Sequence, residues 1–73
     1  MKNPEYTIEQ HVKTNVNAAI DLVDDYCGLS GAFDAFQQNT IESVIEDGYK
    51  TEDAITASEL FTIEFRKKTG FSK

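Results

Sequence analysis

The side chains best suited to chemistry are a single histidine, His11, and a single cysteine, Cys27. A cysteine nucleophile needs its histidine base within hydrogen-bond reach. The local pattern predicts that both residues lie on one helix, where they would be separated by about 24 Å along the axis. We therefore expect His11 to lie partly exposed beside Tyr6 and Cys27 to serve as a small core residue.

Metal and phosphate sites are also absent from the sequence pattern. No cysteine or histidine pair stands at zinc-binding spacing, and the glycines occur singly rather than in a phosphate-binding loop. Asp21, Asp24, Asp25 and Asp34 lack the alternating spacing of a calcium loop. The sequence therefore predicts no metal site, no cofactor, no catalytic residues and no enzymatic activity.

The acidic residues are distributed unevenly along the chain. There are 13 acidic and 7 basic residues among 73, a formal net charge of −6, and no lysine or arginine occurs between Thr14 and Tyr49. Acids also end two predicted helices, where the helix dipole disfavours them by about 0.3–1 kcal/mol each when exposed. Either selection for solubility or a binding surface explains this bias. The candidate partner-binding residues are Asp21, Asp24, Asp25, Glu42, Glu46 and Asp47.

A concentrated acidic surface with apolar residues among the acids suits a basic protein surface. Strongly basic surfaces are mostly those that hold nucleic acid. We therefore expect a small inhibitor or adaptor that binds a nucleic-acid-handling protein, such as a nuclease or a CRISPR-type effector, with nucleic-acid mimicry as one mode. Inhibitors that phages and mobile elements make against host defence are often of this size and charge.

Direct binding to nucleic acid or to a membrane is not expected. The one basic cluster, Arg66-Lys67-Lys68, falls in the last turn of a predicted helix, where cations favour the dipole. No run of 18 apolar residues is present. With one cysteine the chain forms no internal disulfide, so a reducing, cytoplasmic location is the simplest expectation.

The elements that position these residues are predicted to be three helices, over about 8–27, 31–47 and 52–69. The first begins with the capping-box pattern of Thr7 and Gln10. Apolar residues recur at intervals of three and four along each segment. We therefore expect an all-α, small three-helix bundle, formed by a single helical domain over 1–73, with 1–6 as an N-terminal extension and 71–73 as the C-terminal end.

Glycine followed by an apolar residue predicts where these helices end. Such pairs occur at 28–29, 48–49 and 70–71. In this ending the glycine adopts a left-handed conformation and the apolar residue folds back onto the last turn. The expected partners are Val23 for Leu29, Val44 for Tyr49 and Phe65 for Phe71.

The segment from Leu60 to Phe65 also alternates in the manner of a strand. Because no second segment shows this period, we interpret it as helical, with an extra apolar stripe through Leu60 and Ile63. Those two residues are the predicted oligomer interface of a homodimer. The alternative function is accordingly a structural or assembly protein that forms a helical homo-oligomer through apolar helix faces.

Overall fold

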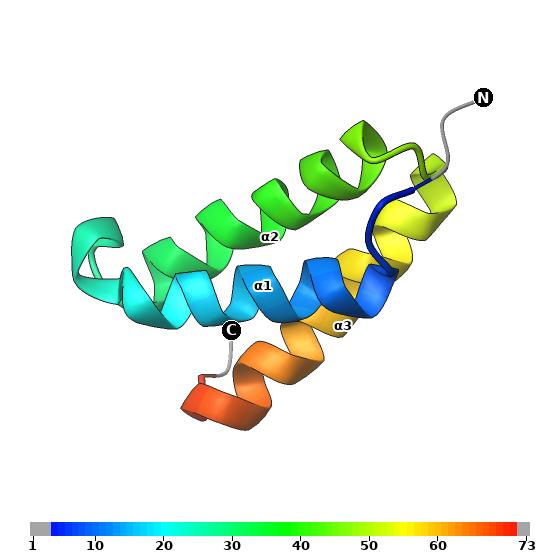
Figure 1. The fold of residues 1–73 in the computed structure, drawn as a ribbon. Helices are drawn as coiled ribbons and strands as arrows, with labels where there is room; N and C mark the ends of the chain where they lie inside the picture. Colours follow the sequence, from blue (N-terminus) through cyan, green and yellow to red (C-terminus); the bar gives the residue numbers. More distant parts are fainter. Residues whose placement is uncertain (1–3, 72–73) are drawn as a thin grey trace.

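The computed structural model describes residues 4–71 as three α-helices and one short 3₁₀ helix. In chain order these are α1 (Ile8–Asp21), η1 (Val23–Tyr26), α2 (Leu29–Glu46) and α3 (Thr51–Thr69). Helices α1 and α3 run in the same general direction and α2 runs against both (Figure 1). The predicted all-α three-helix bundle is confirmed, and the segment that alternates like a strand lies inside α3.

The core lies where the three helices meet, and phenylalanine side chains fill one end of it. Phe33 of α2 lies with its ring centroid 5.7 Å from that of Phe61 and 5.6 Å from that of Phe65. Phe71 closes the cluster at 5.5 Å from Phe33. The buried apolar residues are Val12, Val16, Ala19, Ala32, Phe33, Val44, Ala54, Ala57, Phe61 and Phe65.

The predicted starts and stops of the helices are confirmed at three places. Gln10 N–H donates to the Thr7 hydroxyl at 3.1 Å, and Thr7 N–H donates to the Gln10 side chain at 2.8 Å. At the end of α2, Tyr49 N–H donates to the Val44 carbonyl. Gly70 has a φ of 74°, and the ring of the following Phe71 lies 5.8 Å from that of Phe65.

The end of the first predicted helix differs from the expectation. Helix α1 stops at Asp21, the chain continues as η1, and Cys27 takes the left-handed conformation with a φ of 63°. Gly28 donates to the Val23 carbonyl and forms the N-cap of α2, so it is not the capping glycine predicted for 8–27. Cys27 is exposed, which corrects its assignment to the core.

Close backbone packing explains this early reversal. A Cβ atom at Gly31, in the first turn of α2, would overlap the carbonyl oxygen of Tyr26. The glycine therefore lets η1 lie directly against α2, and the chain turns back before a longer first helix could form.

This contact predicts the effect of replacing Gly31 by alanine. In an ordinary helix the change gains about 1 kcal/mol of helix propensity. Here the new methyl group displaces the Tyr26 backbone, and overpacking of this kind costs about 1–3 kcal/mol. We expect Gly31→Ala to lower the free energy of unfolding in urea titrations.

The matched control is Ser30→Ala, at the exposed neighbouring position, which should change the free energy of unfolding by less than about 0.5 kcal/mol. A more stable Gly31→Ala protein would contradict the contact.

Candidate functional site

The six acidic residues proposed as a partner-binding surface lie at two opposite ends of α2. Asp21, Asp24 and Asp25 lie around η1, the corner at the left of Figure 1. Glu42, Glu46 and Asp47 lie in or just after the last turns of α2. The distance along α2 from its first residue to Glu42 is about 20 Å. The molecule therefore carries two separate acidic groups, and these six residues do not form one patch.

The acids around η1, here called the corner acids (Asp21, Asp24 and Asp25), are all exposed. Of these three, only Asp21 lies in the last turn of an α-helix, because Asp24 and Asp25 lie in the first turn of η1. The unfavourable dipole position predicted for Asp24 and Asp25 at the end of the first helix is therefore corrected. These two acids carry no such cost at an α-helix C-terminus.

Two apolar side chains are exposed among the corner acids. Leu22 is 38% exposed and Tyr26 is 40% exposed, and both lie within the same few residues of chain. The Tyr26 ring packs edge-on against Phe36 of α2 with centroids 5.2 Å apart, which limits its freedom to move. Tyrosine is enriched in protein-binding surfaces, so this partly exposed ring is a candidate contact for a partner.

Asp47 differs from the other five acids because it is buried, whereas they are exposed. Its side chain accepts the N–H of Glu5 at 2.9 Å and the N–H of Tyr6 at 3.0 Å. His11 Nε2, on α1, donates to the same carboxylate at 2.8 Å. The bonds from Glu5 and His11 are the main causes that lower the pKa of Asp47 from 3.8 to about 2.

Two tyrosines complete this arrangement, here called the Asp47 cluster (Asp47, His11, Tyr6 and Tyr49). The His11 ring lies edge-on to Tyr6 at 5.8 Å and to Tyr49 at 6.2 Å between centroids. The Tyr49 hydroxyl donates to the Tyr6 carbonyl at 2.7 Å. The predicted contact of His11 with Tyr6 is confirmed. Asp47 itself holds the fold together, so we remove it from the partner-binding set.

The cluster does not assemble a nucleophile next to its histidine–carboxylate pair. Ser43 lines the same hollow as His11, but its hydroxyl donates to the Thr40 carbonyl at 3.1 Å. Within residues 4–71 no three His, Cys, Asp or Glu side chains are grouped so as to hold a metal ion. What the cluster does chemically is hold the N-terminal segment against α1 and the end of α2.

A second polar contact that the sequence did not predict joins α1 to α2. Asn39 donates to the Asn15 side-chain oxygen at 2.6 Å, and Asn15 donates to the His11 carbonyl at 2.8 Å. Asn15 is nearly fully buried, on the face of α1 that faces the core. An asparagine within an apolar stripe was the available signal for this contact, because a buried amide requires hydrogen-bond partners.

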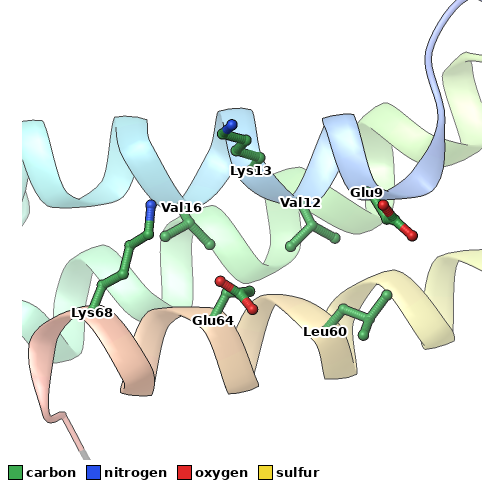
Figure 2. A pocket seen from close by; sticks show the side chains of 7 residues that line it. All are labelled: Glu9, Val12, Lys13, Val16, Leu60, Glu64 and Lys68. Atoms are coloured by element: carbon green, nitrogen blue, oxygen red, sulfur yellow. The ribbon is translucent and has the colours of Figure 1, made fainter.

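The two residues predicted as an oligomer interface have different surroundings. Leu60 is partly buried and lines a groove between α1 and α3, whereas Ile63 is 56% exposed and does not line it. Figure 2 shows Leu60 in this groove with Val12 and Val16 of α1. Leu60 and Ile63 therefore do not form one continuous stripe.

The basic residues of the described chain lie outside η1 and α2, which contain no lysine or arginine. Lys13 is on α1, Lys50 precedes α3, and Arg66, Lys67 and Lys68 occupy the last turn of α3 as the sequence predicted. Lys68 also donates to the Asn17 side-chain oxygen at 3.2 Å. None of the helices within residues 4–71 is both long enough and apolar enough to span a membrane.

The lowered pKa of Asp47 predicts a specific dependence of stability on pH. A carboxylate whose pKa falls on folding stabilises the folded state above its ordinary pKa, and this contribution is lost as the pH falls toward the folded value. Asp47→Asn should therefore lower the urea midpoint above about pH 4. The difference from the unmodified protein should shrink as the pH approaches 2.

The matched control for this measurement is Glu42→Gln, which removes an exposed carboxylate from the same helix. Its urea midpoint should follow that of the unmodified protein at every pH. A difference between Asp47→Asn and the unmodified protein that stays constant from pH 6 to pH 2 would contradict the role given to this carboxylate.

Comparison with known proteins gives no relative for this chain: no family model, no curated protein and no solved structure matches it.

Proposed function

We propose that this protein is a non-enzymatic acidic interaction protein that binds a basic surface of a nucleic-acid-handling protein, as an inhibitor or adaptor. The observation that carries the proposal is the η1 corner, where three exposed acids surround the partly exposed Leu22 and Tyr26. The finer expectation, an anti-defence inhibitor of a nuclease or CRISPR-type effector, belongs to the same proposal.

The corner combines the two contributions that a protein interface needs. Its acids attract a basic partner over a distance and speed the encounter. The exposed parts of Leu22 and Tyr26 can then be buried against the partner, which supplies affinity that the charges alone do not provide. Within residues 4–71 the side chains of Asp21, Asp24 and Asp25 make no hydrogen bond or ion pair, so their charge is available to a partner.

Two of the remaining acids form a second negative group at the other end of α2. Glu42 and Glu46 are exposed near the far end of α2, about 20 Å or more from the start of that helix. Helix α2 itself carries no lysine or arginine. Two negative groups this far apart support binding at two points along an elongated basic channel, the shape that holds a nucleic-acid strand.

A structural role as a helical homo-oligomer is the second candidate. It is favoured by two isoleucines of α3, because Ile55 is 54% exposed and Ile63 is 56% exposed. The dependence of binding on salt concentration distinguishes these two candidate functions. Contacts between exposed charges weaken as ionic strength rises, whereas apolar contacts persist.

The proposal predicts that the protein displaces nucleic-acid-binding proteins from DNA. A DNA-cellulose column loaded with an extract of the native host is washed with the purified protein at 50 mM salt. We expect it to release a discrete set of bound proteins. Reversing Asp24 and Asp25 to lysine should reduce that release at least tenfold, because attraction becomes repulsion at the corner.

The matched control is reversal of Glu52 and Glu59 to lysine, two exposed acids of α3. This variant has the same net charge as the corner variant, so it separates placement from total charge. It should release the same proteins as the unmodified chain. Equal loss in both variants, or release that is unchanged at 500 mM salt, would contradict binding through the corner.

A further inference from the structure

A groove runs between α1 and α3 on the side of the bundle away from α2. It encloses about 490 Å³ and has an apolar floor of Val12, Val16 and Leu60. Its rim is formed by four charged side chains, two from each helix, and Figure 2 shows these flanking the floor. They are Glu9, Lys13, Glu64 and Lys68.

The rim charges follow the same order on both helices. Glu9 precedes Lys13 by four residues on α1, and Glu64 precedes Lys68 by four residues on α3. Within residues 4–71, Glu9, Lys13 and Glu64 make no ion pair. The two helices run in the same direction along the groove (Figure 2).

We propose that this groove is the docking surface for a second copy of the chain. The rim is self-complementary, which a twofold interface requires. If the twofold axis runs along the helices, α1 lies over α3 of the other copy. Lys13 and Glu64 lie at a similar level along the groove, so each meets its opposite charge across the interface (Figure 2).

The reverse twofold arrangement does not pair the rim charges in the same way. If the axis runs across the helices, each helix meets its own copy in reverse. Because Lys13 and Glu64 lie at a similar level (Figure 2), an axis that places Glu9 opposite Lys13 of the second copy does not also place Glu64 opposite Lys68 of the second copy. The rim charges therefore favour the arrangement in which α1 lies over α3 of the second copy, where Lys13 and Glu64 gain ion-pair partners that they lack within residues 4–71 of one chain.

Electrostatics also favours this face over the surfaces of α2 and η1. The chain has a net charge of −6, and α2 and η1 contain acids but no lysine or arginine. Two copies therefore repel when they approach through those elements. The groove has two acids and two bases, so a second copy can approach there without this repulsion.

The area that the groove face can bury indicates how tightly two copies would associate. Helix α1 is about 21 Å long, and packed helices lie about 8–10 Å apart. A face of two such helices is at the small end of specific interfaces, which bury about 800 Å² on each partner. The dimer should accordingly form and dissociate with concentration. It uses a different face from the η1 corner and does not depend on the function proposed above.

The test uses two variants with opposite rims. In the acidic-rim variant Lys13 and Lys68 become glutamate, and in the basic-rim variant Glu9 and Glu64 become lysine. Sedimentation velocity up to 1 mM protein should show a dimer for the unmodified chain and a monomer for each variant alone. An equimolar mixture should regain association at least tenfold stronger than that of either variant. Both variants keep a net negative charge, so total charge does not drive the mixing.

The matched control exchanges charges outside the groove, with Glu59→Lys and Lys67→Glu on α3, and should associate as the unmodified chain does. Circular dichroism establishes that each variant is folded. Where a double variant is unfolded, Lys13→Glu is mixed with Glu64→Lys instead. A monomeric unmodified chain at 1 mM, a mixture that stays monomeric, or a dimer that Ile63→Ser abolishes would overturn the proposal.

Discussion

The interaction on which the rest of the structure depends is the burial of the Asp47 carboxylate at the junction of the N-terminal segment, α1 and the end of α2. Its oxygens accept from the backbone of Glu5 and Tyr6 and from the ring of His11. An acid at the C-terminal end of a helix is unfavourable by itself. Here three donors offset that cost, and the carboxylate fixes where α1 begins relative to the turn that leads into α3.

The opposite end of α2, at the η1 corner, is held together by different contacts. At the η1 corner the helices are joined by backbone packing at Gly31 and by the edge-on contact of Tyr26 with Phe36. Neither contact uses a charged side chain, and in the described part of the chain the side chains of the corner acids make no hydrogen bond or ion pair. The acidic residues therefore divide by role: Asp47 stabilises the bundle, whereas Asp21, Asp24 and Asp25 remain exposed.

Local features of this chain were predictable from sequence, and contacts between distant segments were not. The three helices, the Thr7 capping box and the Gly70 ending depend on neighbours within a few residues. The end of α1 was missed because the apolar spacing continues through Val23, while the reversal depends on how Gly31 meets a backbone atom in space. The role of Asp47 was missed for the same reason, since its donors lie about 40 residues away.

The uneven distribution of charge bears on both the groove between α1 and α3 and the η1 corner. Helix α2 lies behind the groove between α1 and α3, so a copy docked in the groove leaves α2 and η1 exposed on both subunits (Figure 2). The pair would then present two acidic corners to one basic surface. Linking two sites in this way raises avidity without any new contact, provided the partner's sites match their spacing. A groove with equal numbers of acidic and basic side chains and an acidic outer surface are therefore compatible, because the two surfaces would bind different partners on different faces.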